Sequence, residues 1–289
     1  TGCILKGICG KNSSTSSAMD LLLFVVRGVC TVADILRANG HQIGEEVNSF
    51  VTDALFSTIT NANFDDESIL ARVDKGMNLR NNLVDLACEK GISLPMVDEL
   101  IWMGSRSDYV EKSRMVGVLR ENDEDLRSLK ELIVYGLKGM AAYHEHAMRL
   151  GYSNEDIHAF MHSTIRKITT DKLSAEELTG LVLHTGEVGV KVMALLDKAN
   201  TESYGHPEMT EVNIGVGKNP GILISGHDLH DIEDLLKQTE GTGVDVYTHS
   251  EMLPAHYYPA FKKYRHFVGN YGNAWWKQRE EFTSFNGPI

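Results

Sequence analysis

The sequence predicts an α plus α/β protein, with a helical domain of two three-helix units over residues 1–203 and the start of an α/β domain over residues 204–289. Two observations predict this fold. A succession of three amphipathic helical segments returns about 110 residues later, which is the pattern of an internal repeat. Near residue 205 the helical period gives way to short β-rich runs that alternate with helices.

Three helices are expected in the first repeat, over residues 13–39, 45–60 and 66–90. The first has serines that can cap its beginning, and it ends at Asn39 and Gly40, which form a typical stop signal. Cys30 lies in the apolar stripe of this helix, where a buried thiol acts as a small hydrophobic group.

The second repeat returns the same pattern and is joined to the first by an expected helical stretch around residues 93–118. The matching segments are residues 21–28 with 132–139, and residues 45–51 with 155–161. The third helix is expected over residues 174–199, and Ser174 with Glu177 forms a capping box at its start. In this alignment Cys30 pairs with Ala141, which favours a core position for both.

Composition and charge exclude several classes of protein. The 289 residues are 42% hydrophobic and 24% charged, so neither a disordered chain nor a disulfide-stapled miniprotein is expected. The formal net charge of −12 repels phosphate backbones and anionic membrane surfaces, so we expect no nucleic-acid partner. The longest apolar run, residues 21–26, is far shorter than the roughly 20 residues of a membrane-spanning helix, so we expect no membrane contact.

Five histidines lie on the helices of the second repeat. His158 and His162 are four residues apart and could share a metal ion, but no carboxylate partner accompanies them in a recognised motif. We expect these histidines to be solvated or at the edge of the core. The full set is His144, His146, His158, His162 and His184.

The second domain is expected to be the beginning of a parallel, Rossmann-like sheet with helices on its faces. We expect strands at residues 212–216, 222–225 and 244–248, and helices at residues 229–238 and 257–264. The glycine-rich segment 215–221 links two strands instead of a strand and a helix, and its spacing is wrong for dinucleotide binding.

Two metal-competent side chains follow neighbouring strands of this predicted sheet. His227 comes after the strand at residues 222–225, and Glu251 comes after the strand at residues 244–248. Ligands of such sheets bind beyond the carboxyl ends of the strands, where both side chains are presented. We expect Asp228 to cap the following helix and His230 to lie on its first turn.

A zinc deaminase is the first alternative to consider here, because His249 and Glu251 have the His-x-Glu form of that site. The deaminase site also needs a Pro-Cys-x-x-Cys element, and no cysteine follows Cys88 in this sequence. A deaminase is therefore excluded on ligand count.

Cys3 and Cys9 differ from the other two cysteines because glycines surround them in an expected irregular loop. No basic region, apolar core and cleavage site precede them, so we expect reduced thiols and a cytoplasmic location. Iron–sulfur clusters usually take four thiolates and structural zinc takes four nitrogen or sulfur ligands, so this pair supplies half of such a site. Iron and zinc both remain open at this point.

The whole chain resembles the hybrid cluster proteins, also called prismane proteins or hydroxylamine reductases, and more distantly the nickel carbon monoxide dehydrogenases. The resemblance lies in the Cys3-x5-Cys9-Gly-Lys11 segment and in the segments 60–65, 136–141, 213–217, 226–230, 248–256 and 269–275. The last three segments are long and specific.

This resemblance implies two iron–sulfur centres. Cys3 and Cys9 match the third and fourth ligands of the family's N-terminal 4Fe-4S cluster, while His227 and Glu251 match the histidine and the first glutamate of its hybrid 4Fe-2O-2S type cluster. The implied activity is reduction of a small nitrogen-containing substrate, hydroxylamine to ammonia or nitric oxide to nitrous oxide. An electron donor protein is implied as a partner.

The chain departs from the family pattern because the other cluster ligands of the family are absent from these 289 residues. We expect those ligands before Thr1 and after Ile289, in the remainder of the polypeptide or in a second chain, and we expect the isolated chain to be unable to assemble either cluster stably. The alternative is a cluster-free helical and α/β module for folding or interaction. Cysteines encoded on both sides of the segment favour the enzyme, whereas stop codons favour the module.

Overall fold

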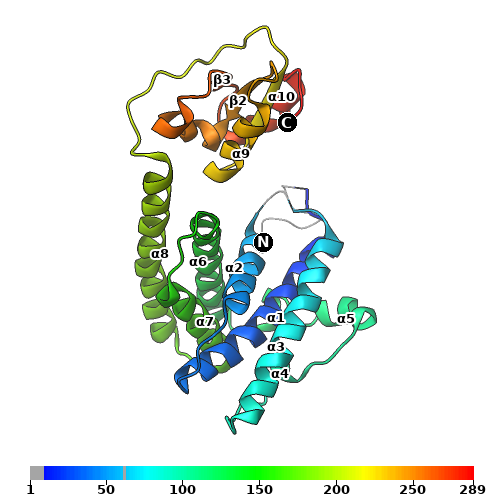
Figure 1. Ribbon diagram of the computed structural model, residues 1–289. Helices are drawn as coiled ribbons and strands as arrows, with labels where there is room; N and C mark the ends of the chain where they lie inside the picture. The colour runs from blue at the N-terminus through cyan, green and yellow to red at the C-terminus, as the bar shows by residue number, and fades with distance from the viewer. Residues whose placement is uncertain (1–9, 61–62) are drawn as a thin grey trace. The chain divides into compact units, whose positions relative to one another are not determined.

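The computed structural model describes residues 10–60 and 63–289, which divide into two compact units (Figure 1). The helical unit takes the described residues up to Glu145 together with Ser153–Met193, and the sheet unit takes His146–Tyr152 and Ala194–Ile289.

Helix α1 (Ser13–Ala38) is the central element of the helical unit, as the sequence predicts. The Asn12 side chain accepts a hydrogen bond from the Thr15 amide at the start of the helix, and Gly40 ends it with a φ of 82°. The helix is apolar on most of its sides, so it is buried by several neighbours instead of one. Cys30 is fully buried, which confirms its position in the core.

Helices α2 (Glu45–Ile59) and α3 (Asp66–Glu89) complete the first repeat and pack against α1. Asp65 caps α3 by accepting a hydrogen bond from the Ser68 amide. Gly76 of α3 allows close packing, because a Cβ atom there would lie 2.5 Å from the Phe50 ring and 2.7 Å from Val25. The bounds of all three helices agree with the sequence prediction to within one residue.

The segment between the two repeats differs from the continuous helical stretch that the sequence predicts. It contains only short helices, namely α4 (Asp98–Ile101), η1 (Arg106–Asp108), α5 (Tyr109–Ser113) and η2 (Val118–Arg120). Gly104 and Gly117 interrupt the helical pattern here. A tertiary contact also holds this segment, because the buried Arg80 guanidinium donates a hydrogen bond to the Glu99 carbonyl at 3.0 Å.

Helices α6 (Glu124–Arg149), α7 (Glu155–Thr170) and α8 (Ala175–Tyr204) form the second repeat in the expected order. The predicted capping box at the start of α8 is present, since Ser174 and Glu177 exchange hydrogen bonds. Among the described residues α8 alone is long and apolar enough to cross a membrane, judged by length and composition. A single such helix is weak evidence for a membrane span.

Three of the five histidines are in the core, contrary to the expectation that they lie at its edge or in solvent. His144, His158 and His162 are at most 1% exposed, because α6 and α7 turn them toward α1 and toward each other. Burial lowers the pKa of His144 and His158 to about 4 and that of His162 to about 3, so all three are neutral near pH 7.

The sheet unit contains a small parallel sheet with strand order β1-β2-β3. The strands are β1 (Gly221–Ser225), β2 (Asp245–His249) and β3 (Phe267–Asn270), and β2 is fully buried. Helix α9 (Leu229–Thr239) connects β1 to β2, and the short elements η3 (Ser250–Tyr257) and η4 (Pro259–Phe261) connect β2 to β3. The chain then continues through η5 (Trp275–Lys277) and α10 (Gln278–Ser284).

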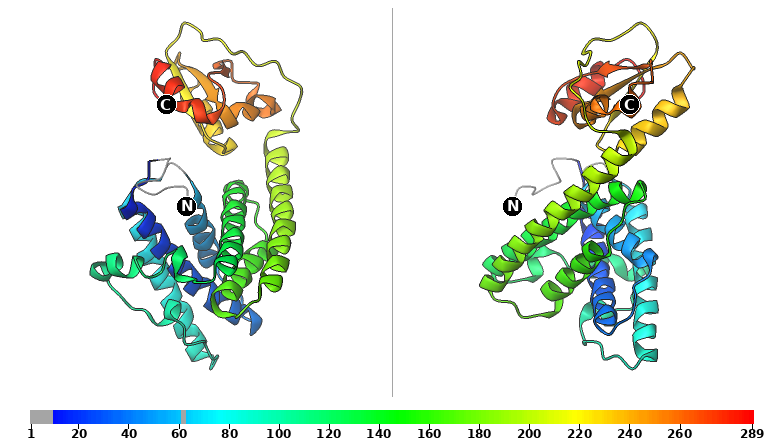
Figure 2. Two further views of the ribbon diagram at one scale, coloured as in Figure 1. Left: turned by 180° about the vertical axis from the view of Figure 1, so that it is seen from behind. Right: turned by 60° about the vertical axis from the view of Figure 1, so that its left-hand side comes forward.

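Residues 212–216 do not form the strand that the sequence predicts. They belong to a long coil between α8 and β1, which Figure 2 shows as an extended trace. The Asn213 side chain accepts a hydrogen bond from the Gly215 amide. This local turn competes with the backbone hydrogen bonds that a strand would make to its neighbour. The predicted helix at 257–264 is replaced by η4, because Pro259 and a sharp turn interrupt it.

The core of the sheet unit lies between α9, β2, η3 and η4. Apolar side chains from all four elements meet there, and the end of α8 contributes Tyr204. The buried members are Tyr204, Leu229, Ile232, Leu236, Val246, Met252, Ala255, Phe261 and Tyr264. This core fixes the strand ends that carry the candidate site.

Candidate metal-binding site at the sheet edge

The structure brings His227 and Glu251 to the same edge of the sheet. Strands β1 and β2 are parallel neighbours, and Ser225 pairs with His249 at their carboxyl ends. His227 lies two residues beyond the first of these partners and Glu251 two residues beyond the second, so both leave the sheet at the same level. Both side chains are exposed, and the charge of His227 acts on the Glu251 carboxyl.

Glu251 is held in its anionic form. Partial burial acts to raise its pKa, but the Ser250 hydroxyl donates a hydrogen bond to its carboxylate, and the charges of His227 and His249 also act to lower the pKa. The net pKa lies below the ordinary value for a glutamate. A carboxylate that is already ionised can bind a cation without first losing a proton.

The backbone at both strand ends adopts unusual conformations. Gly226 has a φ of 151°, which residues with a side chain rarely adopt, so a glycine is needed just before His227. Ser250 has a φ of 53°, the only positive φ of a non-glycine residue in the described part of the chain. Such strain often occurs at functional sites, and here it immediately precedes Glu251.

A series of buried hydrogen bonds centred on His249 supports this edge of the sheet. His249 is fully buried; its Nδ1 lies 2.9 Å from the Ser225 Oγ and its Nε2 lies 2.9 Å from a Glu281 carboxylate oxygen. These hydrogen bonds connect the ends of β1 and β2 to α10. Sequence reasoning considered His249 only within the deaminase pattern and did not identify Glu281, because a contact across 32 residues leaves no local signal.

His256 supports the same strand end from η3. Its Nε2 lies 2.9 Å from the Thr248 hydroxyl, and its ring stacks on Phe267 with centroids 3.9 Å apart. Burial lowers its pKa to about 4, so the ring is neutral near pH 7 and serves as a packing and hydrogen-bonding group.

Asp228 and His230 have the structural roles expected from the sequence. The Asp228 side chain accepts a hydrogen bond from the His230 amide at 2.9 Å, which caps α9, and it also pairs with Arg149 at 3.2 Å. His230 is on the first turn of α9 and lies 3.6 Å from Asp234, one turn further on.

Cys3 and Cys9 lie outside the described residues. Of the described cysteines, Cys30 is buried and Cys88 is exposed. Lys11, two residues after Cys9, donates a hydrogen bond from Nζ to the Thr60 carbonyl at 2.6 Å and so connects the beginning of α1 with the end of α2.

His227 and Glu251 fit an iron centre by their donor chemistry. An imidazole nitrogen and an ionised carboxylate oxygen are both ligands that iron accepts, and their exposure leaves the donor atoms accessible. Fold and site together define an α plus α/β protein with a nitrogen and oxygen donor pair at the carboxyl edge of a parallel sheet.

The chain belongs to the Prismane/CO dehydrogenase family, whose model matches residues 1–289. It is 60% identical over 289 residues to the hydroxylamine reductase of Porphyromonas gingivalis, covering all of this chain and 52% of that protein. It is 59% identical over 289 residues to the hydroxylamine reductase of Bacteroides thetaiotaomicron, again covering all of this chain and 52% of the relative. The hydroxylamine reductase of Clostridium botulinum is 54% identical over 314 residues, with 55% of its length covered.

The chain thus spans about half the length of the curated relatives it matches. Among solved structures, it is similar to a nickel-free carbon monoxide dehydrogenase from Thermococcus sp. AM4 produced without the CooC maturase. That match has a TM-score of 0.28 and 16% identity, and it covers 88% of this chain and 39% of the other.

Proposed function

We propose that this chain is part of an iron–sulfur oxidoreductase that reduces small nitrogen species, hydroxylamine to ammonia or nitric oxide to nitrous oxide. The observation that carries the proposal is the meeting of His227 and Glu251 at one sheet edge, in a chain whose relatives are named hydroxylamine reductase.

In this proposal His227 and Glu251 are ligands of a hybrid 4Fe-2O-2S type cluster, and Cys3 and Cys9 are ligands of a 4Fe-4S cluster. The hybrid cluster would supply iron sites that are open to substrate, and the 4Fe-4S cluster would relay electrons. The missing ligands come from the remainder of the polypeptide or from a second chain. An electron donor protein supplies the electrons.

The protein residues contribute orientation and charge. Gly226 allows His227 to leave the strand end, and the Ser250 hydroxyl fixes one oxygen of Glu251 by a hydrogen bond. The chain from Ser225 through His249 to Glu281 holds the two strand ends in register. Reduction of hydroxylamine to ammonia and water consumes two electrons and two protons, so the site must be open to protons as well as to substrate.

Three further features belong to the proposal. The three parallel strands are the beginning of a larger, Rossmann-like sheet. The protein acts in the cytoplasm, where thiols stay reduced. It needs neither nucleic acid nor a membrane.

The test uses the complete gene product, purified anaerobically. We expect His227→Ala and Glu251→Gln to lose the paramagnetic signals of the hybrid cluster and the hydroxylamine-dependent oxidation of a reduced dye, while the 4Fe-4S signal remains. His230→Ala and Glu240→Gln are matched controls, because His230 lies on α9 and Glu240 directly follows it. We expect both controls to keep clusters and activity.

Iron and sulfide analysis of the 289-residue chain by itself checks the second part of the proposal. We expect no stoichiometric cluster, since half of the ligands are supplied elsewhere. Full cluster content in this chain would contradict that part, and normal activity of the His227 and Glu251 variants would contradict the site.

One observation favours the alternative of an interaction module. A groove of about 320 Å³ between α6 and α8 is lined mainly by apolar residues and glycines, including Gly136, Gly139, Gly186 and Gly189. Apolar surface of this kind is typical of interaction sites. Iron and sulfide analysis of the complete gene product decides between the two, because a cluster-free complete gene product would favour the module.

A further inference from the structure

A polar cavity in the helical unit is separate from the sheet-edge site. It has a volume of about 290 Å³ and lies where α1, η2, α6 and the end of α7 meet. Four basic side chains line it, from Arg27, Arg120, Arg127 and Lys130, together with the carboxylates of Glu121 and Glu131. A net positive lining is unexpected in a chain whose formal charge is −12.

Two of the four cations are already satisfied by close carboxylates. Lys130 lies 2.6 Å from Glu121, and Arg120 lies 2.6 Å from the buried Glu99. These pairs define the walls of the cavity and leave little charge for a ligand.

The other two cations have donors to spare. The Arg27 side chain is only 16% exposed, its ion pair with Glu131 is 3.9 Å long, and no hydrogen bond from its guanidinium is found among the described residues. The Arg127 side chain donates one hydrogen bond, to the Glu121 carbonyl at 2.9 Å, and forms no ion pair with any described carboxylate. A guanidinium has five N–H donors, so most of the donors of both residues are available.

The electrostatic environment of Arg27 is unfavourable without a ligand. Burial lowers its pKa most, and the positive charge of Arg120 lowers it further; Glu131, Glu99 and Asp20 oppose this effect only in part, because the net shift is downward. A partly buried guanidinium of this kind gains from an added anion more than an exposed one does, since water screens it less.

We propose that this cavity binds a small tetrahedral oxyanion, either free phosphate or the phosphate group of a small metabolite. The forks of Arg27 and Arg127 match the oxygen geometry of such a group, and the volume suits a ligand of few atoms. The inference does not depend on the iron–sulfur function.

Isothermal titration calorimetry of the full chain with inorganic phosphate, at constant ionic strength, tests the proposal. We expect saturable binding to the wild type and at least about tenfold weaker binding to Arg27→Gln and to Arg127→Gln. The unfolding temperature should rise less with phosphate in these two variants than in the wild type. Arg114→Gln is the matched control, because this exposed arginine does not line the cavity. It should bind like the wild type.

A competition experiment distinguishes free phosphate from a phosphate group on a small metabolite. Competition by glycerol phosphate would identify a phosphomonoester as the ligand class, and its failure to compete would identify free phosphate. The proposal is overturned if phosphate does not saturate, if both cavity variants bind like the wild type, or if the Arg114 variant weakens binding equally. Should Arg27→Gln not fold, the Arg127 variant decides, since the Arg127 side chain makes a single hydrogen bond to the described residues.

Discussion

The central helices of the two repeats, α1 and α6, have matching sequences but different surroundings. Leu21 of α1 is completely buried, whereas its equivalent Leu132 of α6 is 55% exposed. Phe24 is 1% exposed and its equivalent Tyr135 is 58% exposed. Equal hydrophobic periodicity thus predicts equal helices but not equal burial, because burial depends on how many neighbours cover the helix.

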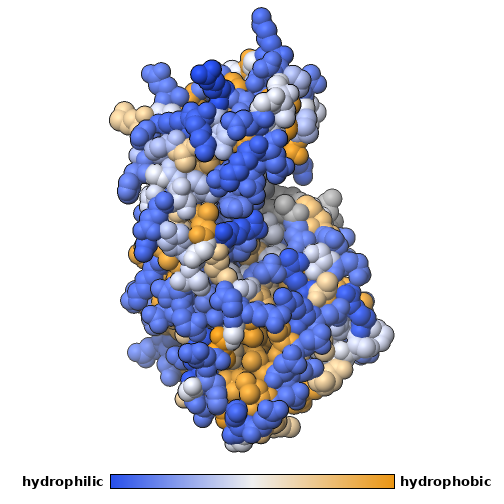
Figure 3. All heavy atoms as spheres, in the orientation of Figure 1, coloured by the Kyte–Doolittle hydropathy of each residue, from blue (hydrophilic) through white to orange (hydrophobic). Residues whose placement is uncertain are grey.

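The difference arises from the packing partners. Helices α2, α3, α5 and α7 all contact α1, which leaves it without a free side. Helix α6 keeps an open side toward the glycine-lined groove, and several large apolar side chains of α6 and α8 remain exposed. Figure 3 shows one face of the molecule, on which an apolar area of the helical unit lies open among hydrophilic residues.

The largest expected effect concerns the difference in burial between matching leucines of α1 and α6. Leu21→Ala removes a fully buried side chain and should lower the free energy of unfolding by about 2–5 kcal/mol. Leu132→Ala makes the same chemical change at the matching exposed position and should stay within about 0.5 kcal/mol of the wild type. Urea unfolding followed by circular dichroism measures both; similar losses would show that the open side of α6 is covered in solution.

A second prediction concerns the three buried histidines of the second repeat. Their folded-state pKa values, about 4, 4 and 3, lie below the ordinary value of 6.5. The folded state therefore binds fewer protons than the unfolded state, so stability is complete above pH 6.5 and falls as the pH drops below it. As the pH falls from 7 to 5, each histidine should lower the free energy of unfolding by roughly 2 kcal/mol.

His162→Thr checks this acid sensitivity, because threonine is the residue at the matching position of the first repeat, Thr52. The drop in unfolding free energy between pH 7 and pH 5 should shrink by roughly 2 kcal/mol in the variant. An unchanged drop would mean that His162 is not buried in neutral form. Comparing the two pH values within each protein removes the cost of the altered packing.

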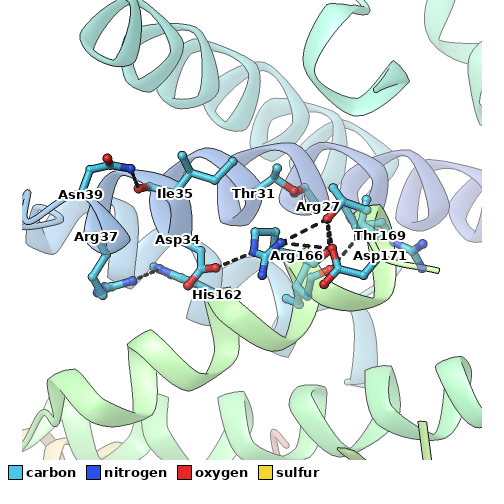
Figure 4. Close-up of polar contacts among 12 residues, drawn as sticks. Arg27, Thr31, Asp34, Ile35, Arg37, Asn39, His162, Arg166, Thr169 and Asp171 are labelled. Carbon is cyan, nitrogen blue, oxygen red and sulfur yellow. Dashed lines mark hydrogen bonds and ion pairs between the residues drawn. The ribbon is translucent and has the colours of Figure 1, made fainter. Parts of the chain in front are cut away.

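The smallest expected effect concerns the polar contacts that connect the repeats. Arg166 of α7 lies 2.6 Å from Asp34 of α1, and Arg37 of α1 contacts His162 of α7 (Figure 4). Arg37 also donates a hydrogen bond to Glu155 at 2.7 Å. A double-mutant cycle of Asp34→Ala and Arg166→Ala should give a coupling energy of about 1 kcal/mol, since both side chains are only partly buried. A coupling near zero would show that apolar packing alone holds α7 on α1.

The sequence predicted the long helices well because each has a clear apolar period, and the capping box at Ser174 marks the start of α8 correctly. The cap of α1 is Asn12 and not one of the serines that the sequence suggests. The sequence did not predict β3, which has four residues and no alternating pattern, or the coil at 212–216. The placement of His227 and Glu251 at one sheet edge could be predicted because each lies two residues beyond the end of its strand. Glu281 could not, because only the folded chain brings α10 to His249.

The burial of α1 has a consequence for synthesis. Arg37 and its partner Glu155 are 118 residues apart, so α7 leaves the ribosome roughly 6 to 24 s after α1 at ordinary elongation rates. During that interval only the elements made before α7 can shield the apolar sides of α1, namely α2, α3, the short helices after them and, last, α6. We expect the nascent chain to be a substrate for chaperones until the second repeat has been made.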